Sequence, residues 1–90
     1  MWNMRVVCVW RRASDYGRTV EEWLTEFERR TGVEIESIDP DSIEGESLCR
    51  AYDIVEYPTI IAIDNDGGVL ALWRGEMLPT FDEVNYWVLQ

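Results

Sequence analysis

Two short apolar runs constrain the fold of this chain more than any other feature of the sequence. Residues 5–10 (RVVCVW) are rich in β-branched side chains and show no alternation of apolar and polar residues, which is typical of a strand covered on both faces. Residues 59–64 (TIIAID) form the more hydrophobic run and are predicted to be a central strand. The sequence therefore predicts a sheet with helices packed on both of its faces.

A helical period follows the first run. Four apolar residues of the segment 19–30 share one face of a helix of 3.6 residues per turn: Val20, Trp23, Leu24 and Phe27. Thr19 and Glu22 are spaced as a capping box, and Gly32 stands where a left-handed C-cap is favoured. The sequence leaves open whether this helix begins at Ser14 or at Thr19.

The remaining segments complete an α/β fold. Residues 33–38 alternate like an edge strand, 44–52 are expected to be a short helix, 69–74 a return strand after a hairpin turn, and 80–89 a final helix. The predicted order is β-α-β-α-β-β-α, in one domain spanning residues 1–90. The first two strands are expected to be parallel and the last two antiparallel, which gives a mixed four-stranded sheet.

Composition narrows the classes of function. The formal net charge of −10 disfavours binding to nucleic acid or to an anionic membrane surface. The chain has no His and no Lys, so catalysis by a Ser-His or Cys-His pair and ligation of a metal by His are excluded. We expect no metal and no cofactor. The 2 Cys lie far apart in the sequence, which favours a reducing, cytoplasmic setting.

One segment carries a resemblance to a known family. Residues 51–61 (AYDIVEYPTII) resemble the A-x-Y-x-I-x-x-x-P-T segment of the thioredoxin superfamily, and the order of elements agrees with that family. The resemblance implies a short, glutaredoxin-sized thioredoxin-like core with a cis peptide bond before Pro58. It also implies that the site of the protein lies beside this proline.

The redox pair of the family is absent. When the sequence is aligned on Trp10, the positions of the family's Cys-x-x-Cys motif hold Ser14-Asp15-Tyr16-Gly17. With no His or Lys to activate it, Ser14 is interpreted as a helix N-cap. Cys8 is the candidate for an alternative function, that of an atypical monothiol oxidoreductase or a glutathione-linked enzyme. This alternative requires an accessible, acidic thiol, whereas the position of Cys8 within a strand indicates burial.

The resemblance implies a site that binds an extended peptide or protein segment. Arginines flank the expected site and are suited either to hold an anion or to pair with Asp15, Glu21 and Glu22. Tyr16 and Tyr57 are equally consistent with an aromatic groove and with packing; for Trp10 and Trp73, core packing is favoured. The candidate binding residues are Arg11, Arg12, Ser14, Asp15, Tyr16, Gly17, Arg18, Tyr57, Pro58 and Thr59.

The prediction for the function is therefore a redox-inactive peptide-binding module. We expect a monomer or a weak homodimer, with an edge strand or an aromatic patch as the surface through which two copies associate.

Overall fold

The chain folds in the predicted order β-α-β-α-β-β-α. The structure is a computed structural model and describes residues 5–75 and 77–88. Its elements are β1 (Arg5–Val9), α1 (Gly17–Thr31), β2 (Glu36–Ile38), α2 (Ile43–Tyr52), β3 (Thr59–Ile63), β4 (Val69–Arg74) and α3 (Phe81–Val88). The predicted end of the last helix at Leu89 lies outside the described residues. None of the helices in the described part of the chain is long and apolar enough to span a membrane.

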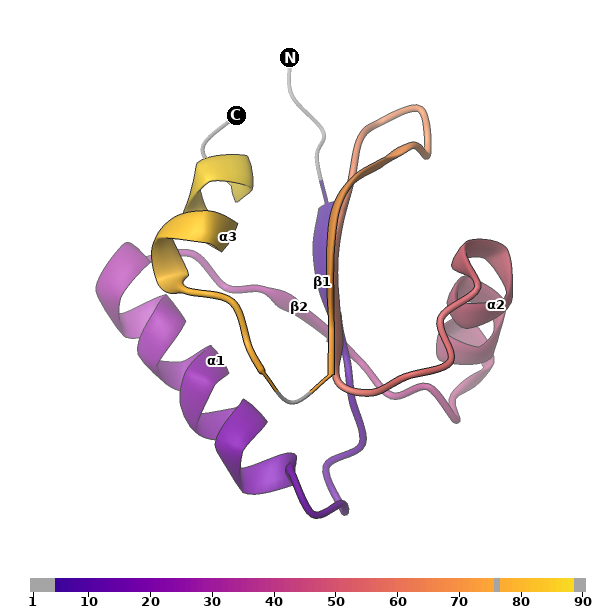
Figure 1. Ribbon diagram of the computed structural model, residues 1–90, viewed down its shortest axis with the longest axis horizontal. Helices are drawn as coiled ribbons and strands as arrows, with labels where there is room; N and C mark the ends of the chain where they lie inside the picture. Colours follow the sequence, from indigo (N-terminus) through magenta and orange to yellow (C-terminus); the bar gives the residue numbers. More distant parts are fainter. Residues whose placement is uncertain (1–4, 76, 89–90) are drawn as a thin grey trace.

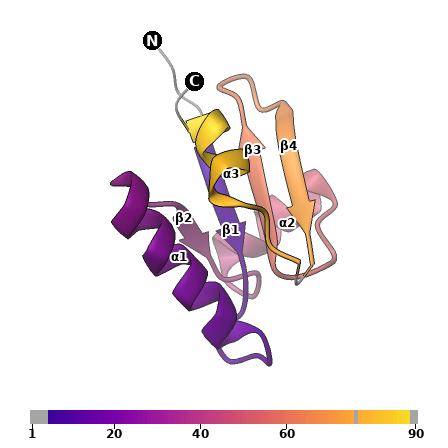
Figure 2. The same cartoon turned by 60° about the vertical axis from the view of Figure 1, so that its left-hand side comes forward.

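The strands form one mixed sheet in the order β2-β1-β3-β4 (Figure 2). β1 and β2 are parallel, while β3 is antiparallel to both of its neighbours. All residues of β3 are buried, which confirms the prediction of a central strand. β2 and β4 are the two edges of the sheet, and the confirmed edge position of β2 fits its alternating sequence.

Helices cover both faces of the sheet, as the two apolar runs predict. α1 and α3 lie on one face and α2 lies on the other (Figure 1). Because successive side chains of a strand point to opposite faces, Cys8 packs towards α1 and α3, whereas Val7 and Val9 pack towards α2. The sheet therefore separates two hydrophobic clusters.

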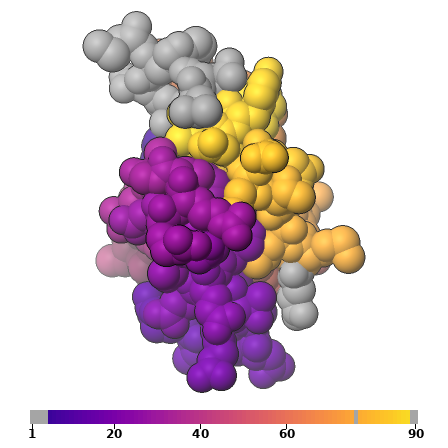
Figure 3. All heavy atoms as spheres, turned by 90° about the vertical axis from the view of Figure 1, so that its left-hand side faces the viewer, coloured from indigo at the N-terminus to yellow at the C-terminus, as the bar shows by residue number. Residues whose placement is uncertain are grey.

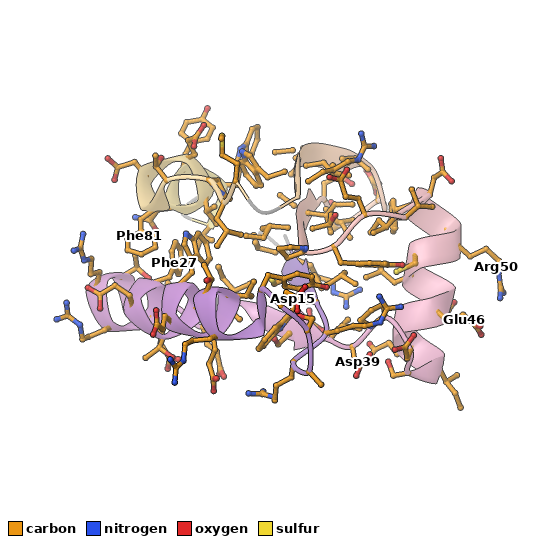
Figure 4. The ribbon with its side chains drawn as sticks, turned by 60° about the horizontal axis from the view of Figure 1, so that its bottom comes forward. Asp15, Phe27, Asp39, Glu46, Arg50 and Phe81 are labelled. Atoms are coloured by element: carbon orange, nitrogen blue, oxygen red, sulfur yellow. The ribbon has the colours of Figure 1, made fainter. Side chains whose placement is uncertain are left out.

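An aromatic group joins α1 to α3. The ring of Phe27 stacks on Trp23 with centroids 5.4 Å apart and meets the edge of Phe81 at 5.6 Å. Figure 4 shows Phe27 and Phe81 meeting between the two helices, and Figure 3 shows α1 and α3 packed side by side on this face of the molecule. This contact sets the position of the segment that leads into α3.

The start of α1 differs from both predicted positions. The helix begins at Gly17, and its N-cap, Tyr16, makes no side-chain capping bond. The predicted capping box of Thr19 and Glu22 is therefore wrong, because both residues lie inside the helix. Gly17 is required here: a Cβ atom at this position would lie 2.1 Å from the carbonyl oxygen of Arg12. The preceding loop is thus packed directly against the first turn of α1.

Two other predicted boundaries are adjusted by tertiary contacts. The segment 33–38 contributes only Glu36–Ile38 to the sheet, since this is the part in register with Val7–Val9 of β1. α2 begins one residue earlier than predicted, because the side chain of Ser42 accepts a hydrogen bond from the N–H of Gly45 (2.9 Å). At the end of α1, Gly32 adopts the predicted left-handed C-cap with φ of 75°.

Candidate functional site

Pro58 stands where the loop after α2 enters β3. The Tyr57–Pro58 peptide bond is cis, and Pro58 is buried. The carbonyl oxygen of Pro58 accepts a hydrogen bond from the N–H of Gly75 (2.8 Å), so the end of β4 holds the proline in place. Thr59 is also buried, and its hydroxyl donates to the carbonyl oxygen of Glu56 (2.6 Å). Thr59 therefore stabilises the loop and is not exposed at the surface.

A small pocket opens beside Pro58. Its volume is about 110 Å³, and three segments distant in the sequence form its walls: the N-terminal part of α1, Pro58, and the chain before α3. The lining residues are Asp15, Tyr16, Thr19, Val20, Pro58 and Leu78. Figure 4 places Asp15 at the start of α1. The structure thus brings together three of the predicted site residues, Asp15, Tyr16 and Pro58.

Three lining residues were not predicted. Thr19 and Val20 follow Tyr16 by one helical turn and therefore lie on the same side of α1. Once the helix is known to start at Gly17, this spacing indicates that they line the same pocket. Nothing in the sequence indicates that Leu78 lines the pocket, because its position depends on the path of the chain between β4 and α3.

The side chain of Tyr57 does not enter this pocket. Its ring packs on the α2 side of the sheet, and its hydroxyl donates to the carbonyl oxygen of Ile54 (3.4 Å) and towards the sulfur of Cys49 (3.9 Å). Burial is the main cause that raises the pKa of Tyr57. Of the two tyrosines, only Tyr16 therefore lines a groove. Trp10 and Trp73 pack with the α1 and α3 cluster, as favoured by the sequence.

The backbone polar groups of Tyr57 are unpaired among the described residues. Neither its N–H nor its carbonyl oxygen forms a hydrogen bond with any residue in the ranges 5–75 and 77–88. The guanidinium group of Arg11 lies 4.7 Å from the centre of the tyrosine ring and covers one of its faces. Arg11 in turn forms a two-pronged ion pair with Asp41, with N···O distances of 2.8 Å and 3.0 Å. This pair holds the pKa of Asp41 below its usual value.

The three arginines do not form an anion site. Arg11 is paired with Asp41, and Arg12 is paired with Glu21 at 3.1 Å. Arg18 lies on the outer surface of α1 beside Glu21 and Glu22 and forms no ion pair with a described residue. Of the two alternatives, ion pairing applies to Arg12, whose partner is Glu21, whereas Arg11 is paired with an aspartate 30 residues away instead of Asp15.

Ser14 is not the N-cap of α1. Its hydroxyl donates to the carbonyl oxygen of Arg11 (2.6 Å), and its own carbonyl accepts from the N–H of Gly17 (3.1 Å). The interpretation of Ser14 as a cap is wrong because the helix starts three residues later and Ser14 closes the turn before it. Gly17, a predicted site residue, is buried and shapes this turn without lining the pocket.

Cys8 does not meet the requirements of the enzymatic alternative. The side chain is 0% exposed, and burial raises the pKa of its thiol to about 12. Cys49 packs on the opposite face of the sheet, and both cysteines are free. Within the described residues no group of three or more His, Cys, Asp or Glu side chains is arranged to hold a metal ion.

Alkylation tests the state of Cys8. We expect iodoacetamide to leave Cys8 unmodified in the folded protein between about pH 7 and pH 9, and to modify it after unfolding in urea. These pH values lie below the pKa of about 12 of the Cys8 thiol in the folded protein, so the thiol stays protonated. Its buried side chain also has no path to solvent. Mass spectrometry of peptides carrying Cys8 and Cys49 measures both sites. Rapid labelling of Cys8 in the folded state would contradict its burial and reopen redox chemistry.

Comparison with solved structures finds the same arrangement of elements in thioredoxins. The reduced Schistosoma mansoni thioredoxin is 22% identical and aligns with 96% of this chain and 76% of its own, with a TM-score of 0.70. Fasciola hepatica thioredoxin is 17% identical over 97% of this chain and 79% of its own, with a TM-score of 0.69. Chlamydomonas reinhardtii thioredoxin f2 is 13% identical over 98% and 78%, with a TM-score of 0.69.

No protein-family model matches the sequence, and no curated protein matches it. The similarity to these thioredoxins is therefore one of three-dimensional arrangement, and it extends over almost the whole chain. This chain has a thioredoxin-like fold.

Proposed function

We propose that the chain is a redox-inactive thioredoxin-like module that binds an extended peptide or protein segment beside Pro58. The observation that carries the proposal is the backbone of Tyr57, which has no hydrogen-bond partner among the described residues, next to the pocket at Pro58. An extended segment forms hydrogen bonds through its own backbone and places alternate side chains in pockets. The site offers both features within a few residues of each other.

The Pro58 pocket favours one apolar side chain of the partner. Val20, Pro58 and Leu78 supply apolar walls, and Tyr16 adds an aromatic ring with a polar end. Beyond Leu78, the side chain of Met77 is 90% exposed and extends the apolar surface. An exposed, flexible methionine is suited to contact with a partner, because its side chain adapts to different shapes.

Charge adds a preference to this site. Asp15 is exposed at the rim of the pocket, and the whole chain has a net charge of −10. A segment that carries Arg or Lys close to its apolar anchor is therefore favoured over an acidic one. No thiol chemistry is needed for such binding.

Panning with a phage-displayed library of random peptides tests the proposal. We expect enriched peptides to combine an apolar residue with a basic one, and their affinity to fall at least about tenfold in Thr19→Lys, since the longer side chain obstructs the Pro58 pocket. Thr25→Lys is the matched control, because Thr25 is an exposed residue of the same helix away from this pocket. Its effect should stay within about twofold, measured by calorimetry with a synthetic copy of the enriched peptide.

Two results would overturn the proposal. One is a library that yields no binder to the folded chain. The other is a set of binders for which Thr19→Lys and Thr25→Lys weaken the affinity equally, because that would reflect charge alone and not the Pro58 pocket.

A further inference from the structure

The outer edge of β4 is an unpaired and unusually apolar strand edge. β4 pairs with β3 on one side, and no strand or helix of the described part of the chain lies along its other side (Figure 2). Its sequence, VLALWR, has no acidic residue and only one charge, at Arg74. Val69 is 50% exposed, and the residues from Leu70 to Trp73 are half-buried. Exposed edges of this kind usually carry charges or prolines that prevent further pairing, and β4 lacks both before its last residue.

The register of β4 shows which backbone groups are free. The N–H of Gly75 donates to Pro58, which places the backbone groups of Gly75 and Trp73 towards β3. Because hydrogen-bonding directions alternate along a strand, those of Leu72 and Arg74 point away from the sheet. The side chain of Leu72 packs on the face of the sheet covered by α2, and that of Trp73 packs on the face covered by α1 and α3.

We propose that the β4 edge binds a second copy of this chain, antiparallel to the first, with Leu72 of each copy opposite Leu72 of the other. This register pairs the outward backbone groups of Leu72 with each other and places Arg74 opposite Leu70 of the second copy. The two sheets then continue as one, and the half-buried apolar side chains on both faces of β4 gain a matching row of neighbours. The Pro58 pocket takes no part in this contact.

Charge selects a second copy in this orientation. Arg74 is exposed and forms no ion pair with any residue of the described ranges, although the chain has 18 acidic residues. In the antiparallel arrangement its long side chain extends towards the hairpin turn of the other copy. There the carboxylate of Asp64 accepts hydrogen bonds from the N–H groups of Asp66 (2.9 Å) and Gly68 (2.8 Å), with Asp66 beside it.

The same charge disfavours other contacts between copies. At a net charge of −10, most contacts between two copies would bring carboxylates close together. A contact between two β4 edges avoids this repulsion, because the strand contains no acidic residue. A single pair of edge strands buries less surface than a stable interface of roughly 1,600 Å². The dimer is therefore weak, with dissociation at micromolar concentrations.

Sedimentation velocity over about 10–500 μM tests the dimer. We expect the wild-type chain to shift reversibly from monomer to dimer in this range, and Arg74→Glu to remain monomeric, since it places a carboxylate beside the acidic turn. Arg18→Glu changes the net charge equally at another exposed arginine without an ion pair among the described residues, and it should dimerise like the wild type. A monomeric wild type, or equal loss in both variants, would overturn the proposal.

Cross-linking tests the register independently of charge. In a Cys49→Ser background, Leu72→Cys should form an intermolecular disulfide under mild oxidation, because paired residues of antiparallel strands have Cα atoms about 5.5 Å apart, within the range of a disulfide. Val55→Cys, at a residue that is 80% exposed and away from β4, is the control for random collision. Circular dichroism establishes that each variant is folded. Cross-linking of folded Leu72→Cys at no more than the rate of Val55→Cys would overturn the proposed register. Peptide binding by a wild-type chain that stays monomeric would leave the Pro58 proposal intact while the dimer proposal fails.

Discussion

Phe27→Ala should lower the free energy of unfolding by about 3–5 kcal/mol. The side chain is 0% exposed and fills the space between α1, α3 and the sheet. Its removal deletes a stacked contact with Trp23 and an edge contact with Phe81 and leaves a cavity that rigid neighbours do not refill. For a domain of this size the loss is a large part of the whole stability, which is typically about 5–15 kcal/mol.

Urea unfolding followed by tryptophan fluorescence measures this effect. Ile43→Ala is the control, because Ile43 is 90% exposed and its truncation should change the free energy of unfolding by less than about 0.5 kcal/mol. A cost below about 1 kcal/mol for Phe27→Ala would contradict the tight aromatic contact between α1 and α3.

Gly17→Ala is the second substitution with a large expected effect. The new Cβ atom would lie 2.1 Å from the carbonyl oxygen of Arg12, which is backbone and therefore unable to rotate away. The loop before α1 or the first turn of the helix must shift, at a cost of about 3 kcal/mol. Since Asp15 and Tyr16 lie in this segment, the same change should also weaken peptide binding at the Pro58 pocket.

Gly32→Ala separates steric overlap from backbone strain. Gly32 has φ of 75° but no atom within 4 Å of a Cβ at its position, so its substitution should cost only about 1 kcal/mol. Urea unfolding of both variants gives the comparison. If Gly17→Ala costs no more than Gly32→Ala, the loop is looser than its contact with Arg12 indicates.

The order of the elements was predictable from the sequence because it depends on local periodicity. Apolar runs without alternation marked the buried strands, and the 3.6-residue period marked α1. The segment around Pro58 predicted the position of the pocket through its resemblance to a known family, because the residues that carry this resemblance are consecutive. These signals act over a few residues, and no distant part of the chain is needed to interpret them.

The features that were missed depend on contacts between distant segments. The start of α1 is set by the approach of Gly17 to Arg12, and the partner of Arg11 is Asp41, 30 residues away. Leu78 lines the pocket only because the chain after β4 turns back towards α1. No spacing in the sequence indicates such pairings, since each depends on where the sheet places the ends of its strands.

Gly17, at the start of α1, also limits whether a redox-active cysteine pair can be engineered into this fold. In the alignment on Trp10, Ser14 and Gly17 stand where thioredoxins have their cysteine pair, so two substitutions are the obvious route to a disulfide reductase. A cysteine at Gly17 brings the same Cβ into the Arg12 carbonyl, and its sulfur would have to occupy space that the loop already fills. A working dithiol therefore requires a redesigned loop of different shape or length, because Ser14→Cys and Gly17→Cys alone would give a less stable protein in which the second thiol does not fit.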